Sequence, residues 1–154
     1  MAADEQKARM TPPRSFLVPV TSLPASLEAV GVACRLARHN KGRVFAIHVI
    51  EVLRSLPLNV EMEIEARRGE QVLRRAEEVA AQWDHKISAE LLQAREAGPA
   101  IVDEARDRAV DAIVMGIGYK RIMGNFQVGR TADYVLKHAD CQVWVVRQAV
   151  SAQE

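Results

Sequence analysis

The sequence predicts an α/β protein: a single domain with an open, parallel, five-stranded sheet and helices on both faces. The first observation behind this prediction is that short apolar runs alternate along the chain with longer amphipathic segments, the order typical of βαβ units. Right-handed crossovers through such helices make neighbouring strands parallel. The second observation is composition, because 154 residues with 49% hydrophobic and 27% charged residues can form one substantial core.

The first part of the chain is expected to hold two strands with a helix between them. Phe16–Val20 is a short apolar run closed by the turn-rich segment TSLP, which predicts the first strand. Apolar residues recur three and four apart over Ala25–His39, which predicts a helix that stops at the segment 40–42. Arg43–Ile50 contains the run VFAIHVI and is expected to be the second strand.

The middle of the chain is expected to form a loop, a long helix and a third strand. After the loop at 52–60, the helix runs to about Trp83, which closes its apolar stripe and is expected to anchor it. Glu63 and Arg67 lie four residues apart with the acid first, the favourable order for an ion pair on a helix. Residues 87–92 alternate between apolar and polar, which predicts a strand near an edge of the sheet.

Four further elements complete the predicted fold. Gly98 and Pro99 open a helix, and a buried strand follows at Ala112–Met115. Another helix begins at about Gly129, and the last strand is the apolar run Val143–Val146. This order of elements completes the five strands.

The two ends of the chain are expected to lie outside the domain. Residues 1–13 are polar and end in two prolines, which predicts a disordered arm; the domain spans 14–148, and 149–154 form a tail. Cys34 and Cys141 form no CxxC pair or Cys/His cluster, so we expect two small buried apolar residues and no metal site.

Composition argues against several classes of partner. A formal net charge of +1 and an aromatic content of 5% give no reason to expect nucleic acid as a partner. No apolar run nears the roughly 18 residues of a membrane span, so membrane insertion is not expected. The first residues lack the apolar core of a signal peptide. We therefore expect a cytoplasmic protein.

The loop after the strand at Ala112–Met115 is expected to be an anion site. It is rich in glycine, carries Lys120, Arg121 and Arg130, and contains no acidic residue before Asp133. A strand, a glycine-rich loop and a helix start are how α/β proteins build phosphate sites, because the helix presents free N–H groups and a partial positive charge.

Four segments of this chain resemble the universal stress protein family of the UspA type. They are FLVPVTSLPAS, FAIHVIEV, AIVDEARDRAVDAIVMG and GRTADYVLKHADCQVWVVR. The resemblance implies the strand order 3-2-1-4-5 in a Rossmann-like sheet similar to that of adenine nucleotide alpha-hydrolases. It also implies a homodimer through the strand at 142–147 and, in one branch of the family, ATP binding.

The nucleotide-binding branch carries Gly, two residues, Gly, nine residues, Gly, and then Ser or Thr. Gly116 and Gly129 match this pattern, whereas Tyr119 replaces the middle glycine and Arg130 replaces the hydroxyl. Thr21 stands where the family usually has an acidic residue after the first strand. The resemblance implies that ATP or AMP would contact Val20, Thr21, Val49, Gly116, Gly118, Lys120, Gly129, Arg130 and Thr131.

Two functional hypotheses stay open at this stage. The first is a stress-related regulatory protein that binds an adenine nucleotide, with no required cofactor and at most slow ATP hydrolysis, because no set of catalytic residues is visible. The second is a nucleotide-independent adaptor for a membrane transporter, because the last segment also resembles the stress-protein domains of amino-acid permeases. In that case the basic loop is a solvated connection. A flavin-binding protein is disfavoured because aromatic residues are few.

Overall fold

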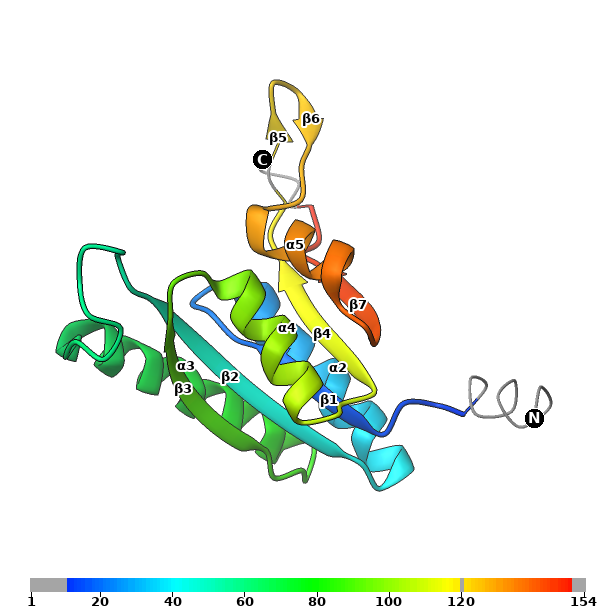
Figure 1. The fold of residues 1–154 in the computed structure, drawn as a ribbon. Helices are drawn as coiled ribbons and strands as arrows, with labels where there is room; N and C mark the ends of the chain where they lie inside the picture. Colours follow the sequence, from blue (N-terminus) through cyan, green and yellow to red (C-terminus); the bar gives the residue numbers. More distant parts are fainter. Residues whose placement is uncertain (1–10, 120, 151–154) are drawn as a thin grey trace, which may run out of the picture.

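A computed structural model describes residues 11–119 and 121–150 of the chain and shows one five-stranded parallel sheet (Figure 1). The spatial order of its strands is β3-β2-β1-β4-β7, which confirms the predicted order 3-2-1-4-5. The expected arm and tail lie largely outside the described residues, since 1–10 and 151–154 are not among them. The strands of the sheet are β1 (Ser15–Pro19), β2 (Arg43–Glu51), β3 (Ser88–Ala94), β4 (Ala112–Ile117) and β7 (Gln142–Arg147).

Helices cover both faces of this sheet, as predicted. They are α2 (Pro24–Asn40), α3 (Glu63–Gln82), α4 (Ala97–Asp107) and α5 (Arg130–His138). Helices α2 and α3 lie on one face and α4 and α5 on the other (Figure 1). The central strand β1 shows why the sheet needs both layers: Phe16 and Val18 belong to one core cluster, Leu17 belongs to the other, and all three are fully buried.

A short hairpin projects from the body between β4 and α5, and it was not predicted. Its strands are β5 (Arg121–Ile122) and β6 (Asn125–Phe126), which pair antiparallel. Met123 and Gly124 turn the chain with positive φ angles of 54° and 81°. The Arg121 guanidinium donates to the carbonyl of Gly124, at 2.9 Å from Nη2, and holds the turn. The basic loop is thus folded in part into a separate two-stranded unit.

Helix α3 forms as predicted and ends at Gln82, directly before Trp83. Its buried face includes Val72 and Ala76, and Glu63 forms the predicted ion pair with Arg67 at 2.5 Å. Trp83 follows the last helical residue, and its ring packs against the core cluster but remains partly exposed, with the Arg35 guanidinium 5.0 Å from its centroid. Trp83 therefore lies at the edge of the core.

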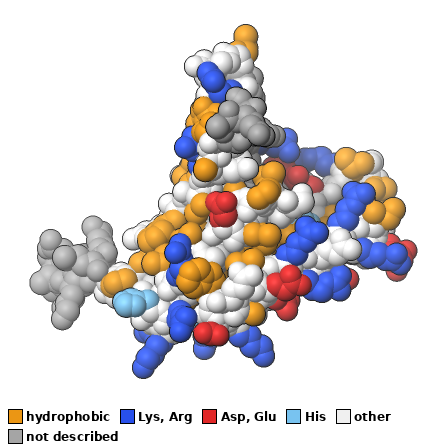
Figure 2. All heavy atoms as spheres, turned by 180° about the vertical axis from the view of Figure 1, so that it is seen from behind, with side chains coloured by type: hydrophobic (Ala, Val, Ile, Leu, Met, Phe, Trp, Pro, Cys, Tyr) orange, Lys and Arg blue, Asp and Glu red, His pale blue; other side chains and the backbone are white. Residues whose placement is uncertain are grey.

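Seen from the side opposite to Figure 1, basic and acidic side chains lie interspersed on the surface (Figure 2).

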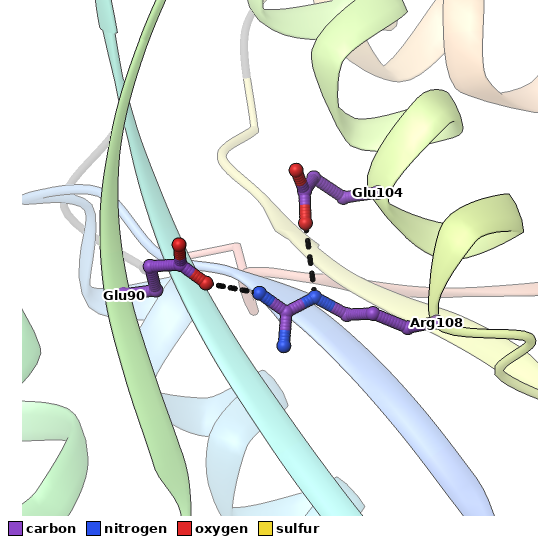
Figure 3. Close-up of polar contacts among 3 residues, drawn as sticks. All are labelled: Glu90, Glu104 and Arg108. Carbon is purple, nitrogen blue, oxygen red and sulfur yellow. Dashed lines mark hydrogen bonds and ion pairs between the residues drawn. The ribbon is translucent and has the colours of Figure 1, made fainter.

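Edge strand β3 is tied to α4 by a cluster of charges (Figure 3). Arg108, at the end of α4, donates to Glu104 at 2.9 Å and to Glu90 of β3. The same guanidinium lies 5.0 Å from the ring centroid of Phe45. The aromatic contact and the two carboxylates leave Arg108 largely buried, so its links hold β3 beside the helix layer.

Both cysteines lie in the packed part of the chain. Cys34 is fully buried on α2, and burial raises the pKa of its thiol to about 11. Cys141 is partly buried just before β7, and burial raises the pKa of its thiol as well. Both thiols therefore stay protonated at neutral pH.

Among the helices of the described residues, none has the length and apolar character needed to cross a bilayer.

The end of the sheet opposite to the strand carboxyl ends is fastened by Asp111. Its Oδ2 accepts the N–H of Arg14 at 2.9 Å and that of Ser15 at 3.0 Å, which ties the start of β1 to the start of β4. Partial burial acts to raise the pKa of Asp111, but these hydrogen bonds outweigh it and bring the pKa below its usual value.

Replacement of Asp111 by Asn should therefore destabilise the protein in a pH-dependent way. A lowered pKa in the folded state means that the charged carboxylate stabilises the fold above the usual pKa of aspartate, and that this stabilisation is lost as the pH falls through the folded-state value. We expect Asp111→Asn to lower the unfolding free energy by about 1 kcal/mol at pH 7, since the site is partly exposed. Urea unfolding at pH 7 and pH 3 measures this, and an equal loss at both pH values would contradict it.

Candidate functional site

A pocket of about 620 Å³ opens at the carboxyl ends of β1, β2 and β4, beside the starts of α4 and α5. Strand β1 pairs with β2 on one side and with β4 on the other, so the order of the strands reverses at this point. Ligands of open α/β sheets bind at such a reversal. The turn after β1 and the loop after β4 both line this pocket.

The inner part of the pocket is apolar. The side chains that form it come from the ends of three strands and from α4: Val20, Ile47, Val49, Ile101, Met115 and Ile117. Val20 is almost fully buried and also belongs to the core, whereas Val49 is partly exposed. A wide apolar surface with a few polar groups at its margin is typical of sites for small organic ligands.

The turn between β1 and α2 supplies hydroxyl groups on one side. Thr21 Oγ1 lies 3.0 Å from Ser26 Oγ, and Ser26 Oγ also accepts the Thr21 N–H at 3.1 Å. Thr21 Oγ1 in turn accepts the N–H of Leu23 at 3.2 Å. Both hydroxyls hold the turn that leads into α2, and both residues line the pocket. Ser26 was not predicted as a pocket residue, because its contact depends on this turn.

Gly116 is required by packing at the floor of the pocket. A Cβ at this position would lie 2.0 Å from the carbonyl oxygen of Ala25 and 2.5 Å from the nitrogen of Ser26. The first turn of α2 therefore contacts the backbone of β4 directly. Glycine at this position lets the backbones of β4 and α2 approach closely, and this role does not depend on a bound ligand.

The start of α5 differs, because it has room in front of it. Gly129 is the N-cap with φ −65° and ψ 163°, values that any residue adopts, and a Cβ there would meet no atom within 4 Å. No side chain among the described residues caps this helix, and its first described main-chain bond comes from the N–H of Asp133 to Gly129 O at 2.9 Å. The N–H groups of Arg130, Thr131 and Ala132 thus face the pocket side unpaired within the helix, a geometry that suits an anion.

Glu51 corrects the expectation that the positive end of α5 stands without a nearby acid. Its Oε2 lies 3.9 Å from Arg130 Nη2 and accepts the N–H of Ala97, at the start of α4, at 3.2 Å. Glu51 lines the pocket at the end of β2 and was not predicted. The loop itself carries no acid before Asp133, and Glu51 reaches the site from another strand.

Two side chains of the loop after β4, Tyr119 and Arg121, are engaged in the hairpin. Tyr119, in the place of the middle glycine, stacks on Phe126 of the hairpin with centroids 5.4 Å apart and lies under the Arg147 guanidinium at 4.9 Å. The Arg121 guanidinium is engaged in the hairpin turn, where it donates to the carbonyl of Gly124. Lys120 lies outside the described residues.

The structure brings together eight of the nine residues predicted for the site. The residues that line the pocket are Val20, Thr21, Val49, Gly116, Gly118, Gly129, Arg130 and Thr131. A role for each in binding remains a prediction. Within 11–119 and 121–150, no group of three or more His, Cys, Asp or Glu side chains is placed to hold a metal ion. Fold and pocket together define an α/β protein with a ligand-sized cavity at the reversal point of its sheet.

Comparison with known proteins gives the family. Residues 13–147 match the Universal stress protein family, and the chain belongs to it. It is 30% identical over 141 residues to a universal stress protein of Methanocaldococcus jannaschii, a match that covers 88% of this chain and 82% of that protein. The family resemblance predicted from four sequence segments is thereby confirmed.

Solved structures of the family share the fold. A universal stress protein from Archaeoglobus fulgidus superposes with a TM-score of 0.75 at 21% identity, covering 86% of this chain and 97% of that one. A structure from the same organism in complex with dAMP gives 0.71 at 19% identity, covering 88% and 99%. A family protein from Arabidopsis thaliana with AMP bound gives 0.63 at 18% identity, covering 92% and 95%.

The two glycines of the motif should respond differently to an added methyl group. Gly116→Ala forces a Cβ against the backbone of α2, so we expect a loss of roughly 2–3 kcal/mol in unfolding free energy. Gly129→Ala, the matched control, adds its Cβ to open space and should change the unfolding free energy by less than about 0.5 kcal/mol. Chemical denaturation of both variants checks this; equal effects would show that the described close approach is wrong.

Proposed function

We propose that this universal stress protein binds an adenine nucleotide in the pocket beside α5. The observation that carries the proposal is the continuity of an apolar cavity with an uncapped helix start in one pocket of about 620 Å³. An adenine ring needs an apolar surface, and a phosphate needs N–H donors and positive charge. The pocket offers the two side by side.

The pocket residues suggest how such a ligand would lie. The base would occupy the apolar part near Val20 and Val49, and the ribose would lie near the hydroxyl of Thr21. The phosphate would face the N–H groups at the start of α5, where Gly129 leaves open space and Arg130 adds a charge. Family structures with dAMP and with AMP support this proposal for the present chain.

The chemistry of the lining favours binding over catalysis. The described lining residues include no histidine, cysteine or lysine, and the hydroxyls of Thr21 and Ser26 are engaged with each other. We therefore infer a regulatory role in which the bound nucleotide is a signal, with ATP or AMP as the candidate ligand and no required cofactor. Three expectations stay predictions from the sequence: slow ATP hydrolysis, a cytoplasmic location and a role as an adaptor for a transporter. The descriptions of the relatives named above mention none of them.

We also infer that two copies pair along β7. This strand is at the edge of the sheet, so one side of its backbone has no neighbour within the described sheet. Val143, Trp144 and Val146 are partly buried on this strand, and Val145 is 39% exposed. An apolar edge strand is normally covered or paired with another strand. A second copy of this chain is the partner that the family resemblance suggests.

Nucleotide binding should depend on Arg130. Arg130→Glu replaces the cation at the start of α5 with a second carboxylate beside Glu51, so we expect AMP affinity to fall at least about tenfold. Arg121→Glu, the matched control, changes a basic residue of the hairpin that does not line the pocket and should alter affinity by less than about twofold. Isothermal titration calorimetry with adenosine, AMP and ATP measures this. Absence of binding by the unaltered protein at millimolar concentrations of all three would refute the proposal.

Dimer formation should depend on Val145. Val145→Lys places like charges near each other across a symmetric strand pair, so we expect a monomer at micromolar protein concentration. Leu53→Lys, on an exposed loop residue after β2, is the control and should leave the association state unchanged. Sedimentation velocity distinguishes the two, and a dimer of the Val145→Lys protein would exclude β7 as the interface.

A further inference from the structure

Glu51 places a negative charge at the rim of the pocket, close to where a phosphate is expected. Its Oε2 accepts the Ala97 N–H at 3.2 Å and lies 3.9 Å from Arg130 Nη2. The start of α4 and the cation of α5 therefore converge on the same carboxylate. The chain thus supplies an anion of its own at this position, one that a ligand phosphate has to face.

The charges of the lining residues balance without a ligand. Among the described residues that line the pocket, Arg130 is the single cation and Glu51 the single anion. A ligand phosphate therefore makes the site net negative, and every further phosphate adds to the repulsion. Among the described groups, the partial charge at the start of α5 opposes this net charge, and it amounts to about half an elementary charge.

We propose that Glu51 determines how many phosphate charges the pocket accepts, by competing with the ligand for Arg130. The inference rests on the proposed function and adds a selectivity to it: the pocket favours adenosine and its monophosphate over the triphosphate. The assignment concerns a residue on β2, outside the glycine-containing loop in which the family motif lies.

The ion pair has the looseness that such a competition requires. The Arg130 side chain is 88% exposed and that of Glu51 is 45% exposed, so their attraction is weak and Arg130 is free to turn to another anion. A phosphate that takes both the arginine and the N–H groups of α5 gains charge-assisted hydrogen bonds. Glu51 then remains beside the phosphate as an unpaired like charge. Its repulsion lowers the affinity for the ligand but does not prevent the ligand from entering the pocket.

Glu51→Gln isolates this charge. The amide oxygen of glutamine can still accept the Ala97 N–H, so the start of α4 keeps its hydrogen bond. The matched control is Asp103→Asn. Asp103 is also an exposed acid of α4, but its carboxylate lies 3.7 Å from Arg106 on the same helix, and it lines neither the pocket nor the small cleft where Glu51 and Arg130 meet. Thermal unfolding of both variants verifies that each is folded.

Calorimetry with adenosine, AMP and ATP on the three proteins provides the test. For Glu51→Gln we expect AMP to bind about threefold to fivefold tighter and ATP about tenfold tighter, with adenosine changed by less than about twofold. Asp103→Asn should change each affinity by less than about twofold. In roughly 0.5 M salt the gain for ATP should shrink, because screening weakens an electrostatic effect and leaves a packing effect unchanged.

The outcomes separate this inference from the proposed function. If the unaltered protein binds nucleotides but Glu51→Gln leaves the ratio of ATP to AMP affinity unchanged, or tightens adenosine equally, the role of Glu51 is refuted and nucleotide binding stands. If the unaltered protein binds none of the three ligands at millimolar concentration, the proposed function fails, and the inference fails with it.

Discussion

The contact between β4 and the first turn of α2 governs the geometry of the pocket. At Gly116 the strand backbone meets the carbonyl of Ala25, with no room for a side chain between them. This approach sets the distance between the β1–α2 turn, which carries Thr21, and the end of β4. Because the strands are parallel, their carboxyl ends share one edge of the sheet, and the turn after β1 therefore faces the loop after β4. The cavity is a consequence of this packing.

The two helices that begin at the pocket, α4 and α5, differ in the groups that lie at their N-termini. The start of α4 receives the Glu51 carboxylate at Ala97, whereas the start of α5 is left uncapped and open in front of Gly129. An exposed helix start attracts anions, and one that already holds a carboxylate does not. This difference favours the start of α5 over that of α4 as the proposed phosphate position. It also places Glu51 where, in our proposal, its charge affects how many phosphate charges a bound ligand carries.

The fold was predictable because its signals are local and mutually consistent. Apolar runs separated by amphipathic helices predicted the strands to within about two residues at each end, a normal uncertainty for boundaries. The order of the strands came from the family resemblance. The hairpin β5–β6 escaped prediction because its strands have two residues each and its turn depends on positive φ at Met123 and Gly124. Trp83 was expected to close the apolar stripe of the long helix; its ring packs against the core cluster but remains partly exposed.

The candidate site was predictable only where a sequence motif marks it. The glycines and Arg130 stand in one segment of the chain, so their spacing drew attention to them. Glu51 and Ser26 reach the same pocket from β2 and from α2, and no local pattern links them to that segment. Tyr119 departs from the motif, yet its contact with Phe126 turns it toward the hairpin, a placement that depends on a unit the sequence did not reveal. The spacing of residues along the sequence does not by itself report contacts between distant segments of the chain.

Amide chemical-shift mapping during a titration with AMP tests the central claim most directly, because it shows both whether a ligand binds and where. The proposal predicts saturable shifts for the amides of Gly129, Arg130 and Thr131 at the start of α5, together with those of Val20 and Val49 at the strand ends. Shifts centred on the outer face of β3 and α4, or none at millimolar AMP, would contradict the assignment of this pocket as a nucleotide site.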